Sequence, residues 1–451
     1  MKIIKSSLIA ILILLGGCVK NQKSSKVKLM TLDPGHFHAA LIQKISYDDI
    51  DGTVDVYAPD GPEVRDFLNK IEGYNSREEK PTNWTVRTHL SEDYLDKMIN
   101  EKPGNVMVVS GKNSKKIDYI WAAVNAGLNV YADKPLVTNQ EDFKKLEKVF
   151  ALAKEKNLLV YDIMTERFEV TTRIQKALSL KSDLFGTLLD GSPSAPAISK
   201  VSVHHLSKIV SGKPLVRPAW FLDTDQQGEG IVDVTTHLVD LVQWEAFPDQ
   251  IIDSSEVKIV SAKRWTTSLS LQQFKKITGL DEYPEYLQKD VKSDTLSIYC
   301  NGEINYTLKG KHAKVSVIWD YEAPEGSGDT HHSSMRGSKS DLIIIQGVTE
   351  NYKPTLYVVA KEMEGFESKL NQAIKSLQEE FPGINTEKVS DNQWKIKIPA
   401  ALKIGHEAHF GQVTDNFLKY YKEGKLPQWE VPNMITKYHT TTRAYKKALE
   451  Q

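Results

Sequence analysis

The stretch VMVVSGKNSKKIDYIWAAVNAGLNVYADKPL, residues 106–136, decides the fold. It begins with a short apolar run, continues as an amphipathic stretch, and returns to a second apolar run after Gly127, a residue type that commonly ends helices. We therefore predict strands over Val106–Ser110 and Leu128–Ala132, and a helix over Lys115–Ala126. A strand, a helix and a strand in this order form a parallel βαβ unit, with the ligand crevice at the carboxyl ends of the strands.

The same alternation extends over residues 27–164. Further strands are predicted at Val27–Leu32, Val54–Ala58, Trp84–Thr88 and Leu158–Ile163. Further helices are predicted at Phe37–Ile45, Pro62–Ile71 and Glu141–Lys156. Repeated βαβ units predict a doubly wound parallel sheet of the Rossmann type. Polar residues that follow these strands should meet in one crevice.

The pattern changes over residues 165–451. Strand-like runs occur at Ile198–His204, Val257–Ala262, Thr295–Cys300, Ile304–Lys309, Lys314–Trp319, Asp341–Gln346, Leu356–Ala360 and Asn392–Ile398. We place Gly326 and Gly337 in a polar loop between two of them. These runs predict a second, mainly antiparallel sheet. The fold class is thus α/β followed by α+β, with helices returning at His406–Tyr421 and Pro432–Leu449.

Charge and length limit the class of protein. The chain has 451 residues, enough for about two to three domains. Its 58 basic and 59 acidic residues give a formal net charge of −1. Because no excess of positive charge is available to hold a polyanion, we expect no nucleic-acid partner.

The first 26 residues indicate export. Residues 1–17 combine Lys2 and Lys5 with an apolar run that is too short to span a bilayer. The sequence Leu15-Gly16-Gly17-Cys18 resembles the bacterial lipobox, which implies a lipidated Cys18 and a polar tether over residues 18–26. An ordinary secretory signal is the alternative. We expect a chain anchored in the cell envelope by lipid alone, facing the periplasm. If Cys18 carries lipid, Cys300 has no cysteine to pair with, and we expect it in the core.

Two motifs carry candidate chemistry. Lys134 follows an acidic residue at a strand end and precedes Pro135, so it can point a cation into the crevice and polarise a hydroxyl or carbonyl oxygen. A lysine in a surface turn is the alternative. The second motif is Gly228-Glu-Gly-Ile-Val-Asp233-Val-Thr-Thr-His237-Leu-Val-Asp240-Leu-Val-Gln-Trp244. Asp233 and His237 are four apart, so on a helix they share one face, and His237 suits a general base. Helix capping or a surface ion pair is the alternative.

Both motifs resemble those of the glucose–fructose oxidoreductase and inositol dehydrogenase (Gfo/Idh/MocA) family over nearly the whole mature chain. The family pattern Gly-x-x-Val-x-x-Glu-Lys-Pro-Leu matches residues 127–136, with Asp133 in place of Glu. The resemblance implies that Lys134 touches substrate and nicotinamide, and that His237 and Asp233 act on the substrate. It also implies that Ser110, Asn113 and Asp133 lie at the cofactor. Arg167 and Trp220 would lie at the substrate, although a role in the core is equally compatible for Trp220. The C-terminal sheet of the family often forms homo-oligomers.

The dinucleotide fingerprint departs from the family. Gly-x-Gly-x-x-Gly is replaced by Asp33-Pro34-Gly35-His36-Phe37-His38, in which only the middle glycine remains. Gly35 still allows a pyrophosphate to approach the loop His36-Phe37-His38. Asp60 ends the second strand and favours NAD over NADP through the adenosine ribose, although a turn residue is equally compatible. Asp33, His36 and His38 could instead bind a metal ion, but we assign no metal site.

We therefore expect an oxidoreductase that acts on a ring hydroxyl or ketone of a sugar or glycoside. The 3-position is one possible site of reaction. NAD, or NADP, would be held tightly, since the family includes exported members that retain their cofactor. Two alternatives stay open: a catalytically weak sugar-binding lipoprotein, and a metal-assisted sugar lyase or hydrolase.

Overall fold

The computed structural model describes residues 26–210 and 213–451. The expected signal, Cys18 and residues 19–25 of the expected tether lie outside the described residues. Within the described part of the chain, no helix is both long and apolar enough to cross a membrane.

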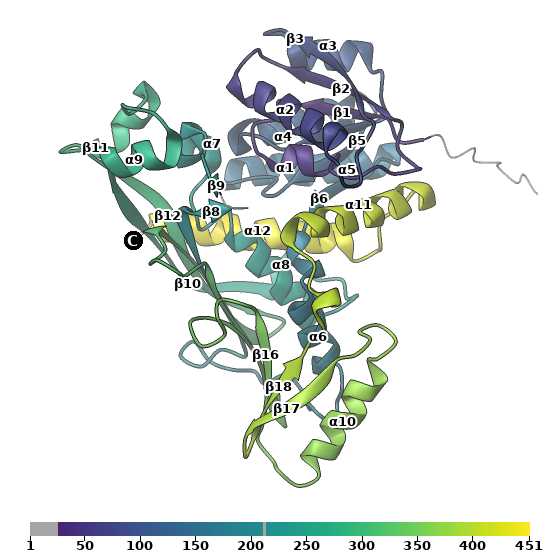
Figure 1. Ribbon diagram of the computed structural model, residues 1–451, viewed down its shortest axis with the longest axis vertical. Helices are drawn as coiled ribbons and strands as arrows, with labels where there is room; N and C mark the ends of the chain where they lie inside the picture. Colours follow the sequence, from purple (N-terminus) through teal and green to yellow (C-terminus); the bar gives the residue numbers. More distant parts are fainter. Residues whose placement is uncertain (1–25, 211–212) are drawn as a thin grey trace, which may run out of the picture.

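The N-terminal sheet is the predicted Rossmann-type sheet. Its six parallel strands are β1 (Leu29–Leu32), β2 (Thr53–Ala58), β3 (Thr85–Leu90), β4 (Val106–Val109), β5 (Asn129–Asp133) and β6 (Val160–Ile163). They are ordered β3-β2-β1-β4-β5-β6. The order reverses between β1 and β4, which places the ligand crevice at their carboxyl ends. Figure 1 shows this sheet with its helices at the upper right.

The helices of this part lie close to their predicted positions, with one exception. They are α1 (His38–Leu41), α2 (Pro62–Ser76), α3 (Tyr94–Glu101), α4 (Asn113–Asn125) and α5 (Gln140–Lys156). The helix predicted over Phe37–Ile45 is wrong in length, because α1 is a single turn. The chain continues from it in tighter turns, because the amides of Gln43 and Lys44 bond to the carbonyls of Ala40 and Leu41, three residues back. Side chains from distant segments then bind the carbonyls at the end of these turns. The Trp84 indole donates to the Gln43 carbonyl at 2.8 Å, and the Arg77 guanidinium donates to the Lys44 carbonyl at 2.6 Å.

The second sheet is larger and mainly antiparallel, as predicted. Its ten strands are β7 (Ile198–Ser207), β10 (Val257–Ser270), β11 (Val291–Lys292), β12 (Thr295–Leu308), β13 (Lys311–Glu322), β14 (Thr330–Arg336), β15 (Ser340–Gln346), β16 (Thr355–Ala360), β17 (Asn385–Ser390) and β18 (Gln393–Lys397). Only β13 and β7 pair in parallel. A separate two-stranded ribbon joins β8 (Ile209–Val210) to β9 (Lys213–Pro214).

Two predictions for this sheet are wrong. The strands expected at Thr295–Cys300 and Ile304–Lys309 are one strand, β12, which runs through Gly302. Gly302 marks a close approach and not a turn, because a Cβ there would lie 2.5 Å from the Cβ of Ile231. The loop expected between Gly326 and Gly337 contains β14. The inward side chains of β14 include His331 and Ser333, which hydrogen-bond to polar partners. The sequence of β14 therefore lacks the alternation of apolar and polar residues that predicts a strand.

The C-terminal part also contains α-helices. They are α6 (Val170–Ser179), α7 (Thr224–Gln227), α8 (Thr235–Ala246), α9 (Leu271–Thr278), α10 (Phe366–Ser376), α11 (His406–Glu423) and α12 (Glu430–Leu449). Figure 1 shows α12 running across the middle of the molecule, between the N-terminal sheet and α8. Phe410 and Phe417 of α11 and Tyr438 of α12 belong to the hydrophobic clusters of the N-terminal sheet. Ala444 and Ala448 of α12 belong to the hydrophobic cluster of the second sheet, so α12 joins both sheets.

Candidate active site

The two sequence motifs meet in the crevice at the end of the N-terminal sheet. Lys134 follows β5, and Asp233 lies in the turn that precedes α8. The Nζ atom of Lys134 is 2.7 Å from Oδ1 of Asp233, and the two side chains are only 10% and 8% exposed. Burial alone would raise the pKa of Asp233, but the Lys134 cation outweighs it and holds that pKa below its usual range. The pair is thus a buried carboxylate and ammonium at the crevice.

A chain of hydrogen bonds supports this pair. Gln227 donates to Oδ2 of Asp233 at 3.0 Å, and Asn113 donates to the Gln227 carbonyl at 2.7 Å. Lys116 donates to Oδ1 of Asn113 at 2.6 Å and to the Asp133 carbonyl at 2.8 Å. Both ends of the Asn113 amide are therefore engaged, and the structure places this residue between the two parts of the chain and not as a free cofactor ligand. Lys116 and Gln227 were not among the residues predicted from the sequence.

His237 lies in the first turn of α8. The prediction that Asp233 and His237 share a helix face is wrong, because α8 begins at Thr235 and Asp233 precedes it. Nδ1 of His237 is buried and has no hydrogen-bond partner among the described residues. Burial, together with the Lys134 cation, lowers the pKa of His237 to about 4. His237 is therefore neutral near pH 7 and can accept a proton from a bound hydroxyl.

Two further ionisable groups reach the same crevice. Glu166 lies in the short 3-10 helix Thr165–Phe168, and His406 begins α11, with their side chains 3.4 Å apart. Burial would raise the pKa of Glu166, but His406 and then His237 bring it well below its usual range. From this short helix the resemblance predicted Arg167, and not Glu166, at the substrate.

Arg167 is not at the substrate side of the crevice. Its guanidinium makes two bonds of 2.6 Å to Asp240 and bonds of 2.9 and 3.1 Å to Glu430. Lys437 joins the same group, 2.9 Å from Asp240 and 2.7 Å from Asp162 at the end of the N-terminal sheet. All of these side chains are buried. Arg167 therefore joins α8 to α12, and Lys437 joins the same group to β6, which corrects the assignment of Arg167 to the substrate.

The loop after β1 takes the place of the dinucleotide fingerprint. Asp33 has a positive φ of 44°, and its carboxylate accepts a hydrogen bond of 2.8 Å from the Tyr119 hydroxyl. The amides of Gly35 and His36 both donate to the Ser110 carbonyl at 3.1 Å. No backbone carbonyl of the described residues accepts from the amides of Phe37 and His38, in the first turn of α1.

Trp220 covers this loop. A Cβ on Gly35 would lie 3.2 Å from Cζ2 of the Trp220 ring. The indole is 3% exposed, and its Nε1 has no hydrogen-bond partner among the described residues. The Lys112 ammonium lies 6.0 Å from the centre of the same ring. The indole N–H, the amides of Phe37 and His38, and the Lys112 cation together suit an anion such as a pyrophosphate.

The predicted ribose ligand is already engaged. Both oxygens of Asp60 accept from Arg65, the shorter bond being 2.7 Å. Both side chains are more than half exposed. The carboxylate thus follows β2 as predicted, but it is shared with a guanidinium that the sequence analysis did not identify.

Two histidines and Asp133 form a compact group. His38 Nδ1 lies 3.0 Å, and His36 Nδ1 3.4 Å, from Oδ2 of Asp133. Ser110 donates to the same oxygen at 2.9 Å. Asp33, which the sequence grouped with these histidines, turns away to Tyr119. Ser110, predicted at the cofactor, therefore contacts Asp133.

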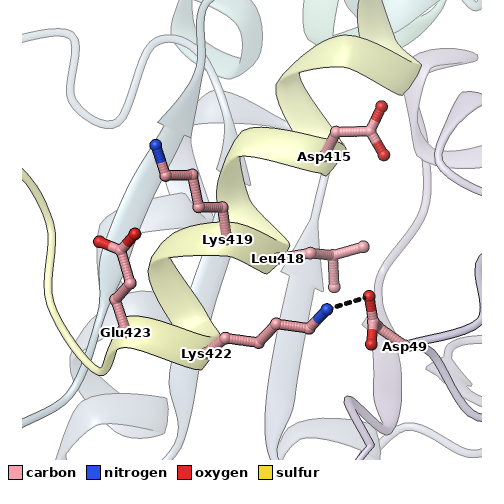
Figure 2. Close-up of a pocket in the computed structure, with 6 residues that line it drawn as sticks. All are labelled: Asp49, Asp415, Leu418, Lys419, Lys422 and Glu423. Carbon is pink, nitrogen blue, oxygen red and sulfur yellow. Dashed lines mark ion pairs between the residues drawn. The ribbon is translucent and has the colours of Figure 1, made fainter.

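A second hollow lies on the outer surface of α11. Figure 2 shows Lys419, Lys422 and Glu423 along this helix, with Lys422 ion-paired to Asp49. That ion pair measures 2.6 Å. None of the crevice side chains described above lines this hollow, so it provides no chemistry comparable to the Lys134–Asp233 pair.

Comparisons with known proteins agree with this architecture. The family described as "Putative oxidoreductase C terminal domain" matches residues 174–449. A crystal structure of a "putative oxidoreductase" from Parabacteroides merdae is 55% identical, with a TM-score of 0.93, and the match covers 94% of this chain and 98% of that one. A search among curated proteins finds no match.

Two more distant structures share the fold. Levoglucosan dehydrogenase, solved in complex with NADH and L-sorbose, is 12% identical, with a TM-score of 0.61, and the match covers 94% of this chain and 97% of that one. Biliverdin reductase from Synechocystis sp. PCC 6803, solved with biliverdin and NADP+, is 11% identical, with a TM-score of 0.57 and coverage of 93% and 98%. On the match over residues 174–449 and the 55% identical structure, the chain belongs to this oxidoreductase family.

Proposed function

We propose that the protein interconverts a hydroxyl and a ketone on a carbohydrate, with a nicotinamide dinucleotide as redox partner. The observation that carries the proposal is the buried pair of Lys134 and Asp233, with the neutral His237 beside it at the end of the N-terminal sheet. Such a group can bind one substrate oxygen and move its proton. The more distant structures with NADH and L-sorbose support the choice of cofactor and substrate class.

The loop after β1 fits the phosphates of a dinucleotide. Its amides at Phe37 and His38, the unpartnered indole N–H of Trp220 and the Lys112 cation supply donors and charge around Gly35. Asp60 and Arg65, which bond to each other beyond β2, would hold the adenosine ribose. When bound, the nicotinamide ring supplies or accepts a hydride.

Side chains of the protein move the hydroxyl proton of the substrate and stabilise the charge that develops on its oxygen. Lys134 donates a hydrogen bond to the substrate oxygen and stabilises the negative charge that develops there. His237, neutral near pH 7, takes the hydroxyl proton when the alcohol is oxidised and returns it when the ketone is reduced. Asp233 keeps the Lys134 ammonium in place, because it is ionised and bonded to it at 2.7 Å.

The position of the reaction on the sugar and the retention of the cofactor are further parts of the proposal. We infer reaction at a ring carbon, with the 3-position a candidate, and retention of the cofactor between turnovers. An exported chain meets little free dinucleotide, so retention would make the enzyme independent of a cytoplasmic supply. We also propose that a lipidated Cys18 anchors the protein in the cell envelope.

Mass spectrometry of the denatured, full-length protein tests the redox role directly. We expect it to release NAD(H) or NADP(H), and we expect a panel of monosaccharides and glycosides to change absorbance at the wavelength of the reduced nicotinamide. A protein that releases no dinucleotide and has no affinity for added NAD or NADP would contradict the proposal. Sugar binding measured in that same preparation would then favour a binding protein.

A further inference from the structure

We propose that His36, His38 and Asp133 form a binding site for one divalent transition-metal ion, with Zn²⁺ as its first candidate. The three residues each offer a ligand atom, and these atoms all lie within 4.8 Å of one another. They come from two segments, the loop after β1 and the end of β5, which the parallel sheet brings together. This site goes beyond the proposed redox function and does not depend on it.

The distances match those of a coordination shell. His38 Nδ1 and His36 Nδ1 lie 3.0 and 3.4 Å from the same oxygen, Oδ2 of Asp133. In a tetrahedral zinc site with bonds of about 2.0 Å, neighbouring ligand atoms lie about 3.3 Å apart. A metal ion can therefore enter with small side-chain movements. Two neutral imidazoles and one carboxylate also form a ligand set that suits Zn²⁺, Fe²⁺ and Mn²⁺.

Hydrogen bonds within this group leave one nitrogen atom, Nδ1 of His36, without a partner. Oδ2 of Asp133 already accepts from Ser110 at 2.9 Å and pairs with His38 at 3.0 Å. His36 Nδ1 points at the same oxygen, is buried, and has no hydrogen-bond partner among the described residues. A metal ion would satisfy this nitrogen and would replace the proton between His38 and Asp133.

Neighbouring side chains hold the three ligands in place. The His36 and His38 rings pack edge to face with centres 4.0 Å apart, and Phe410 packs against His38 at 4.6 Å. Ser110 donates a hydrogen bond to Oδ2 of Asp133 and so restrains the carboxylate. Groups that orient metal ligands in this way commonly contribute about 10- to 100-fold to metal affinity.

The site would also have an open position. Three protein ligands leave at least one place for an oxygen donor, as in zinc sites that bind water or substrate. His36 lies close enough to Asp233 to help lower the pKa of that carboxyl, so the group borders the same crevice as the Lys134–Asp233 pair. The ligand class is thus an oxygen of water, a carbohydrate or a phosphate.

The test uses the full chain after removal of bound metals with a chelator. Co²⁺ is added in steps while visible absorption is recorded, and Zn²⁺ is then used to displace it. We expect one equivalent of Co²⁺ per chain and a spectrum typical of nitrogen and oxygen ligands. His38→Ala and Asp133→Asn should each remove the absorption, and Ser110→Ala should weaken binding about 10-fold or more.

His332→Ala is the matched control, because this histidine is exposed on β14 and outside the group. It should bind Co²⁺ like the unchanged protein. His36→Gln guards against misfolding, since its partly exposed side chain can be replaced with little loss of packing; circular dichroism should show a native fold with no Co²⁺ bound. Absence of stoichiometric binding, or binding that persists in His36→Gln and His38→Ala, would overturn the site. No dinucleotide enters these measurements, so their failure is separate from failure of the redox proposal.

Discussion

The ammonium of Lys134 lies 2.7 Å from the carboxylate of Asp233, although 99 positions of the chain separate the two residues. One belongs to the Rossmann-type sheet and the other to the turn before α8, so their contact can exist only when both parts are folded and docked. Gln227 and Asn113 bond the same two parts around this contact. The candidate active site is therefore a property of the interface between the sheets.

Replacing Lys134 with Met should reduce kcat/KM at least about 100-fold, because the cation that stabilises the developing charge is lost. Steady-state rates with the best sugar of the panel measure this. His237→Ala should have a similar effect for a different reason, the loss of the proton acceptor. Lys112→Met is the control, because it also removes one positive charge but not the one in the Lys134–Asp233 pair. This variant should weaken dinucleotide binding and leave the rate of the chemical step little changed. Near-normal turnover in Lys134→Met would refute the assignment.

The pH dependence should reflect the unusual position of His237. Its pKa of about 4 lies below the value of about 6.5 for a free imidazole. Oxidation of the alcohol needs the neutral ring, so kcat/KM should stay level down to about pH 5 and fall as the pH drops through about 4. A fall centred near 6.5 would show that the ring is not buried beside a cation.

The cause of this shift can be tested separately. Lys134→Met removes the second largest influence on His237, so the pKa of His237 should rise towards 6.5. NMR titration of the labelled histidine ring measures this without any turnover. Because the folded pKa is the lower one, the unfolded chain binds the extra proton. The stability that His237 contributes is therefore complete above about pH 6.5 and declines as the pH falls from there towards 4.

Features that depend only on residues close together in the chain were predicted from the sequence. The parallel sheet, its crevice and the end of β5 follow from local periodicity, and Lys134 was found there. The direction of Asp33 was not predictable, because Tyr119, 86 positions away, draws its carboxylate out of the histidine group. Asp133 takes that place beside His38 because β5 lies one strand beyond β4.

The wrong assignments share the same physical origin. Arg167 was predicted to bind the substrate because its partners Asp240 and Glu430 are 73 and 263 positions away in the chain. The sequence does not indicate that these side chains pair. Strand β12 was predicted as two strands because the sequence gives no sign that Gly302, between them, packs against Ile231. Glu166 and His406 were missed as a pair because their segments meet only when α11 returns to the N-terminal sheet.

Coenzyme preference should depend on the pair of Asp60 and Arg65. Asp60→Ala frees the guanidinium to bind a 2′-phosphate, so the ratio of affinities should move towards NADP(H). Arg65→Ala frees the carboxylate for the ribose hydroxyls and should move the ratio towards NAD(H). Titration of both dinucleotides into the stripped protein measures each ratio. If both variants moved the ratio in the same direction, the adenosine would lie elsewhere.

The expected lipid anchor can be tested in cells. Cys18→Ala should give an unprocessed or soluble product, because the residue that would carry the acyl chains is absent. Metabolic labelling with a fatty acid, followed by membrane fractionation, provides the measurement. Cys300→Ala is the matched control and should leave labelling and fractionation unchanged. Wild-type protein without the acyl label, together with a membrane fraction that is unchanged in Cys18→Ala, would reject the anchor.

Arg167 should be important for stability and not for recognition of the sugar. Arg167→Met leaves Asp240 and Glu430 as buried carboxylates facing Lys437 alone, and breaking a buried ion pair from one side commonly costs about 3–5 kcal/mol of the free energy of unfolding. Chemical denaturation measures this loss. Arg173→Met is the control, since its pair with Glu380 is exposed and should contribute about 1 kcal/mol or less. KM for the sugar, measured well below the melting temperature of Arg167→Met, should be nearly unchanged. A large rise in KM with normal stability would return Arg167 to the substrate site.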